Sequence, residues 1–236
     1  LGVTATRLRA QYKVAVSAQD RVATMMTMRD SVAAADFGSS YAYTFAFLFY
    51  EQFRIIVTEA VTNLCLALGA VILITLVMIV NCTATALVAL MIVLTDVDIL
   101  GMMWYWGLSI DSVSVINLVL AIGLALDYSV HIAHAFTQKP GTDRQARVDA
   151  ALEEMGTPVI HGCLSTFLAV LVLSISNSYV FRVFFRQFFG IVLFGGLHGL
   201  VLLPTLLSLF GPAYVESVKD GAAMHAKEMP EMVLSG

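Results

Sequence analysis

Residues 112–136 carry the sequence SVSVINLVLAIGLALDYSVHIAHAF, which decides the class of this protein. The stretch exceeds the roughly 20 predominantly apolar residues that a helix needs to cross the hydrocarbon core of a membrane. Asp127 is its only Asp, Glu, Lys or Arg residue. We therefore predict a membrane-spanning helix here, with one ionisable carboxylate a little past its midpoint.

The rest of the chain has the same character. Hydrophobic residues make up 59% of the 236 residues and charged residues 13%, whereas a soluble domain is nearer half and a quarter. Four further stretches are long and apolar enough to span a membrane: 60–80, 84–107, 158–177 and 187–210. We predict an all-α membrane protein with about five transmembrane helices, with a transmembrane bundle over 51–213 and a cytoplasmic tail over 214–236.

The first 50 residues differ in composition, and we interpret residues 1–50 as the end of a small α+β extracytoplasmic domain. Residues 11–35 are rich in Ala, Val and Met with charges at intervals, which favours a surface helix. Aromatic residues alternate with smaller ones over 41–49, a period of two that predicts a strand buried on one face. Because a lone strand is unstable and the chain begins at Leu1, we expect the strand's partners in preceding sequence.

Basic residues in the short connections predict the orientation, since cytoplasmic loops are enriched in Lys and Arg. The connection 137–157 and the tail hold five such residues, against three near the opposite helix ends. This bias places the C-terminus in the cytoplasm and the N-terminal segment outside the cell or in a lumen, in a plasma membrane or an endomembrane. Within the connection, residues 142–155 resemble an amphipathic helix lying on the membrane surface.

Four residues of the 112–136 stretch fall on one side of the predicted helix: Gly123, Asp127, His131 and His134. At 100° per residue they lie within about 80° of one another. An ionisable group inside a span is costly, so it indicates a functional site by default. A desolvated carboxylate and an imidazole can together exchange protons or bind a cation, and the glycine would let a neighbouring helix cover them. The alternative is that Asp127 and His131 only satisfy each other as a buried polar pair.

Other polar residues in the spans are secondary candidates. Asp96 and Asp98 point to opposite sides of a helix, so one of them would cap a break or bond to a neighbouring span. Tyr128 is a further secondary candidate, His198 is expected to be a hydrogen-bonding core residue, and the glycines of the last span indicate close helix packing. We find no metal-ligand spacing, nucleotide motif, nucleophile–base arrangement or long basic run, so we expect no metal, cofactor, enzyme activity or nucleic-acid partner.

Two runs carry a family resemblance, GMMWYWGLSIDSVSVIN over 101–117 and IGLALDYSVHIAHAF over 122–136. They resemble the Niemann–Pick type C and Patched-related proteins of the resistance–nodulation–division superfamily. Further matches, in order over about residues 40–213, are FYEQF (49–53), ALEEMG (151–156) and HGLVLLP (198–204).

The resemblance implies a protein with two similar halves, of which this chain matches the end of the second extracytoplasmic domain and the final five spans. It places the family's Gly-x-x-x-acid motif on Gly123 and Asp127, with the downstream histidine on His131. It implies transport of a sterol or another lipid coupled to proton or cation flow, with the missing half or a second chain supplying a facing acidic residue. Asp96-Val-Asp98 resembles the Patched-domain branch more than the Niemann–Pick proteins. The alternative is a non-transporting lipid-binding receptor or a structural subunit of a larger membrane complex.

Overall fold

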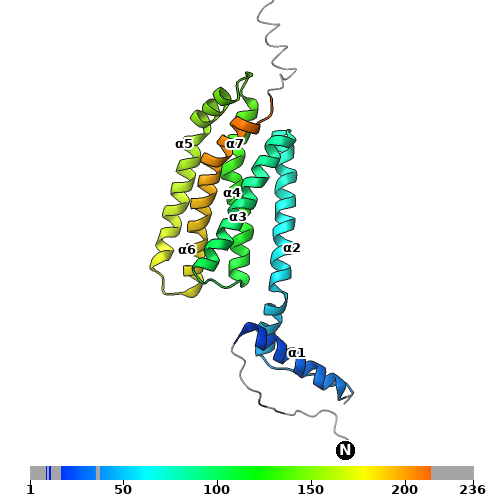
Figure 1. The fold of residues 1–236 in the computed structure, drawn as a ribbon. Helices are drawn as coiled ribbons and strands as arrows, with labels where there is room; N and C mark the ends of the chain where they lie inside the picture. The colour runs from blue at the N-terminus through cyan, green and yellow to red at the C-terminus, as the bar shows by residue number, and fades with distance from the viewer. Residues whose placement is uncertain (1–8, 10, 12–16, 36–37, 214–236) are drawn as a thin grey trace, which may run out of the picture. The chain divides into compact units, whose positions relative to one another are not determined.

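The computed structural model describes residues 9, 11, 17–35 and 38–213, and all regular structure in these ranges is helical (Figure 1). The chain divides into two compact units, residues 1–61 and 62–236. The predicted tail, 214–236, lies outside the described residues.

Five helical segments are long and apolar enough to cross a membrane, which confirms the predicted number. The first three are α2 (Ala46–Ile79), α3 (Cys82–Tyr105) and α4 (Ser112–Gln138). The fourth is α5 (Arg144–Leu171), continued by the 3₁₀ turn η1 (Val172–Ile175). The last combines α6 (Tyr179–Gly190), the π-helical turns η2 (Ile191–Gly195) and η3 (His198–Leu202), and α7 (Leu203–Phe210).

The prediction of a strand over 41–49 is wrong. Residues 41–44 have no regular structure, and α2 begins at Ala46. Phe47 is buried, but the other four aromatic residues of this alternation are each more than half exposed, so the alternating residues bury no common face. The described residues contain no strand with which this segment could pair, and an isolated strand leaves its backbone groups without partners.

The prediction of a separate surface helix over 142–155 is also wrong, because this segment is continuous with the following span in α5. Pro158 lies inside α5 without ending it. A proline removes only one backbone donor, and the buried face formed by Val148, Ala151 and Val159 extends across it. Packing of one continuous apolar face therefore outweighs the local cost of the proline.

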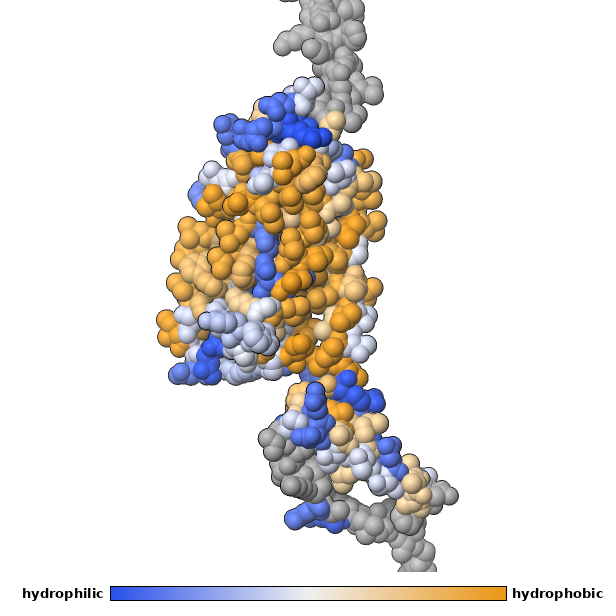
Figure 2. Space-filling view, in the orientation of Figure 1, coloured by the Kyte–Doolittle hydropathy of each residue, from blue (hydrophilic) through white to orange (hydrophobic). Residues whose placement is uncertain are grey.

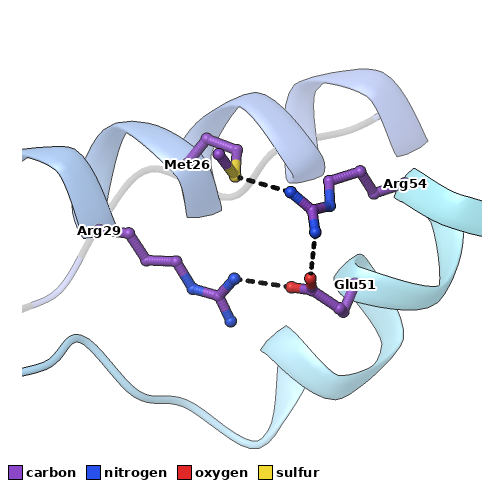
Figure 3. A network of polar contacts seen from close by, with 4 residues as sticks. All are labelled: Met26, Arg29, Glu51 and Arg54. Atoms are coloured by element: carbon purple, nitrogen blue, oxygen red, sulfur yellow. Dashed lines mark hydrogen bonds and ion pairs between the residues drawn. The ribbon is translucent and has the colours of Figure 1, made fainter.

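The unit of residues 1–61 contains α1 (Ala18–Ala34), within the helix predicted over 11–35. Ser17 caps α1 by accepting a hydrogen bond from the backbone N–H of Asp20 at 3.0 Å. Figure 3 shows Glu51 between two arginines, with each of its oxygens 2.7 Å from the guanidinium of Arg29 or of Arg54. The three side chains are partly exposed, so the network fixes geometry more than it adds stability.

The unit of residues 62–236 is a helical bundle with α4 at its centre. Helix α4 packs against α3, α5, α6 and the turns and helix that complete the last span. Its largest cluster of buried side chains includes Ile92, Ile122, Phe136, Leu203 and Leu207. On the face drawn in Figure 2, this bundle has a broad hydrophobic band with hydrophilic residues at its two ends and a narrow hydrophilic strip within the band. This distribution is the one that a membrane-spanning bundle requires.

Arg147 closes one end of the bundle. Its side chain is 2% exposed and lies over the ring of Phe136 at 4.1 Å from the ring centroid. One nitrogen donates to the carbonyl oxygen of Phe136 at 3.0 Å and another to that of Pro212 at 2.8 Å. The residue four positions after Phe136 is Pro140, which has no N–H, so the helix itself cannot satisfy this carbonyl. Arg147 therefore supplies a donor that the end of α4 lacks.

Candidate functional site

The predicted polar stripe of α4 lies on the outer surface of the bundle. Gly123, Asp127 and His131 are exposed, and His134 is half-buried. Asp127 lies near the middle of Ser112–Gln138, about 3 Å along the axis from its centre. The structure thus brings the predicted residues onto one face, and Asp127 lies near the middle of a helix that is long and apolar enough to cross a membrane.

Asp127 and His131 do not form the mutually satisfied pair of the alternative interpretation. Within the described residues, neither side chain makes a hydrogen bond or an ion pair. His134 has a partner outside the stripe, since one of its ring nitrogens lies 2.8 Å from Nε2 of Gln138. The carboxylate and the first imidazole are therefore available to groups outside this bundle.

Gly123 has open space beside it. A Cβ atom built at this position would meet no described atom within 4 Å. The described helices of this chain therefore do not use Gly123 for close packing, and a covering helix at this glycine remains a prediction.

The opposite side of α4 is tightly packed. Tyr128 is 5% exposed, and the last span approaches its backbone so closely that a Cβ on Gly199 would lie 2.8 Å from its carbonyl oxygen. A Cβ on Gly195 would lie 3.1 Å from the ring of Tyr128. The predicted role of these glycines in close helix packing is confirmed. Tyr128 therefore lies in the core and does not join the exposed stripe.

Asp96 and Asp98 of α3 lie in different environments, as their spacing of two residues predicts. Asp96 is buried, and its Oδ1 atom has no hydrogen-bond partner among the described residues. Asp98 bonds to a neighbouring span, with its Oδ2 atom 3.3 Å from Nε2 of His198. The other ring nitrogen of His198 lies 3.0 Å from Oγ1 of Thr95. His198 is thus a hydrogen-bonding residue, as predicted, but its partners are an acid and a hydroxyl on α3.

Sequence reasoning missed a buried polar contact between α4 and α6. Asn117 and Gln187 are both fully buried, and Nδ2 of Asn117 donates to Oε1 of Gln187 at 2.7 Å. Nε2 of Gln187 donates in turn to the carbonyl oxygen of Ser114 at 3.1 Å. Uncharged amides inside apolar stretches were the available signal. This pair lies near the end of the bundle and links two spans without ionisable groups.

The described residues contain no group of three or more His, Cys, Asp or Glu side chains arranged to hold a metal ion. The ionisable groups of the spans include two separate sets, the exposed α4 stripe and the α3 contact with His198.

Comparisons with known proteins identify relatives of the chain. No family model matches it. It is 38% identical over 185 residues to the NPC intracellular cholesterol transporter 1 homolog 1b of Drosophila melanogaster, an alignment covering 77% of this chain and 15% of that protein. It is 37% identical over 177 residues to the NPC intracellular cholesterol transporter 1 of Sus scrofa, covering 73% of this chain and 14% of the relative.

Similarity extends to a second group of relatives. The chain is 33% identical over 174 residues to protein patched homolog 1 of Danio rerio, covering 73% of this chain and 14% of the relative. The alignments thus span about one seventh of the length of these much longer proteins. With its five candidate membrane spans and these similarities, the chain is a multi-pass membrane protein of the Niemann–Pick type C1 and Patched-related family.

Proposed function

We propose that this chain is part of a membrane transporter that moves a sterol or another lipid, coupled to proton or cation flow through Asp127 and His131. Two of the relatives are named as intracellular cholesterol transporters, which supports a lipid as cargo. Gly123 and His134 complete the site, by admitting a covering helix and by extending the polar face. The C-terminal end of the bundle faces the cytoplasm in this proposal.

One observation carries the proposal: Asp127 is exposed, without a hydrogen-bond or ion-pair partner in the described chain, near the middle of an otherwise apolar span. A carboxylate in the centre of a bilayer costs at least about 2.5–3.5 kcal/mol, so it persists where water, a cation or a partner group reaches it. Movement of one charge through 100 mV releases about 2.3 kcal/mol, which is a usable source of energy for displacing a lipid.

The site requires a second surface. Gly123 is open on the same face as Asp127. We infer that a helix from another part of the complete protein, or from a second chain, packs here and supplies an acidic group opposite Asp127. A carboxylate pair at close range shares protons or binds a cation more readily than one carboxylate alone.

The test uses the complete protein reconstituted in lipid vesicles. Asp127→Asn should abolish sterol transfer and the accompanying proton or cation flux, while the protein remains folded and inserted. The matched control is Glu153→Gln, which removes an exposed carboxylate outside the apolar part of α5. Normal transfer by Asp127→Asn refutes the coupling role. Sterol binding without transfer by the unaltered protein supports the receptor interpretation instead.

A further inference from the structure

A second polar contact joins α3 to the last span. His198, the first residue of η3, lies between Thr95 and Asp98 of α3. Its Nδ1 atom is 3.0 Å from Oγ1 of Thr95, and its Nε2 atom is 3.3 Å from Oδ2 of Asp98. Both nitrogens of one imidazole are therefore engaged by side chains of the neighbouring helix.

The hydroxyl of Thr95 determines where the imidazole protons lie. Its oxygen is 2.8 Å from the carbonyl oxygen of Met91, which only accepts, so the single hydroxyl proton is directed there. Oγ1 of Thr95 must then accept a hydrogen bond from Nδ1–H of His198. A neutral imidazole that carries its proton on Nδ1 has none on Nε2.

This assignment leaves Nε2 of His198 facing the Asp98 carboxylate with no proton between them. An ionised carboxylate only accepts, so the 3.3 Å approach would bring two acceptors together. The approach becomes a hydrogen bond when one additional proton is present, either on Nε2 or on the carboxyl group. The contact therefore depends on a proton that neither group holds when Asp98 is ionised and His198 is neutral.

We propose that Asp98 and His198 form a proton-binding site that ties α3 to the last span and is separate from the Asp127 stripe. With the proton bound, the pair is neutral overall and the two helices are joined. Loss of the proton leaves a net charge of −1 and two opposed lone pairs, so His198 separates from Asp98. Asp98 is the more exposed member of the pair, with 41% of its side chain accessible against 15% for His198.

Among the described residues, Asp98 has no hydrogen-bond or ion-pair partner besides His198, and His198 has none besides Asp98 and Thr95. The last span from Ile191 to Phe210 contains no Asp, Glu, Lys or Arg. On α4, Asp127 is exposed and makes no ion pair within the described residues. On α6, Arg186 donates to the carbonyl oxygen of Trp106 at 3.4 Å. On α3 itself, Asp96 is buried and makes no hydrogen bond or ion pair with His198. This is expected because Asp96 and Asp98, two positions apart, point to different sides of the helix.

The backbone at His198 suits a contact that opens and closes. His198 begins one of two π-helical turns in the last span. Such turns have a wider hydrogen-bonding pattern than the α-helix and occur frequently at functional sites. Pro204, which follows η3, has no N–H with which to complete the regular pattern at Leu200. His198 therefore lies in a stretch whose backbone hydrogen bonding departs from the regular α-helical pattern.

The experiment measures the protonation of His198 directly. The complete protein is labelled with 15N-histidine in lipid nanodiscs, and the imidazole nitrogens are observed by NMR across a pH series. Signals of His198 are assigned from their loss in His198→Gln, or in His198→Asn if that variant does not fold. We expect Nδ1 to be protonated throughout and Nε2 to change with pH.

The decisive comparison is Asp98→Asn. The asparagine amide can donate to Nε2, so this variant keeps the contact without the additional proton. We expect the pH-dependent change at Nε2 to disappear in Asp98→Asn and to persist in Asp127→Asn. A neutral Nε2–H form of His198 in the unaltered protein, or the same pH dependence in Asp98→Asn, overturns the proposal. The measurement involves no lipid movement, so its failure leaves the proposed role of Asp127 intact.

Discussion

Replacement of Arg147 by alanine should destabilise the end of the bundle where α4, α5 and the segment after α7 meet. The guanidinium makes two hydrogen bonds to backbone carbonyls, those of Phe136 and Pro212, and lies over the Phe136 ring. Without the guanidinium, the carbonyl oxygen of Phe136 has no donor, because Pro140 has no N–H to donate to it.

The expected magnitude follows from these contacts. Hydrogen bonds to a charged donor contribute about 1.5–3 kcal/mol each, and a desolvated cation–π contact about 1–2 kcal/mol. Taking the lower values, Arg147→Ala should lower the free energy of unfolding by about 4 kcal/mol. Arg147→Lys should lose roughly half as much, because an ammonium retains the charge but cannot reach both carbonyls in the planar arrangement of a guanidinium.

The assay is thermal unfolding of the complete protein in detergent. The quantity measured is the fraction of protein that remains monodisperse at each temperature. At about 2–4 °C per kcal/mol for a unit the size of this bundle, Arg147→Ala should lower the midpoint of the bundle's unfolding by roughly 10 °C. Arg144→Ala is the matched control, since Arg144 donates to the carbonyl oxygen of Leu209 at 3.0 Å but is exposed. Its loss should cost less than about 1 kcal/mol. Equal midpoints for the two alanine variants would refute the reasoning from burial.

Two further predictions concern packing and orientation. Gly199→Ala should destabilise the bundle by about 1–3 kcal/mol in the same unfolding assay, because its Cβ would lie 2.8 Å from the backbone oxygen of Tyr128. Gly101→Ala is the matched control and should not destabilise it, because Gly101 is exposed and a Cβ there would meet nothing within 4 Å. For orientation, a membrane-impermeant maleimide applied to intact cells or sealed organelles with the lumenal face outward should label Asn177→Cys but not Cys82. Labelling of Cys82 but not of Asn177→Cys would show that the orientation is opposite to the one proposed.

The spans could be predicted from sequence because length and hydrophobicity decide whether a helix crosses a membrane. Helix α4 illustrates this, since one stretch of apolar residues around Asp127 fixed its existence and approximate ends. The prediction of a strand over 41–49 was wrong because it relied on a local pattern alone. A period of two indicates a strand only where a partner strand satisfies its backbone, and the described chain contains none.

The polar contacts were only partly accessible from sequence. The spacing of Asp96 and Asp98 correctly predicts that they occupy different sides of α3, but no local pattern pairs Asp98 with a histidine 100 positions later. The same holds for Asn117 with Gln187 and for Arg147 with two helix ends, since each contact depends on how separate helices pack. Residue spacing within one helix predicts which side chains share a face. The partners of those side chains depend on how the helices pack in the tertiary structure.

The two polar sites of the bundle differ in what completes them. The acid Asp98 meets a histidine from the same chain, so variants at this position report on proton binding within the bundle itself. The acid Asp127 meets no partner within the described residues, although it lies beside an open glycine on a central helix. Burying a lone carboxylate in lipid is unfavourable, so we expect other groups to complete the bundle at the Asp127 face. Effects at Asp127 should therefore depend on the integrity of the whole assembly, and effects at Asp98 should not.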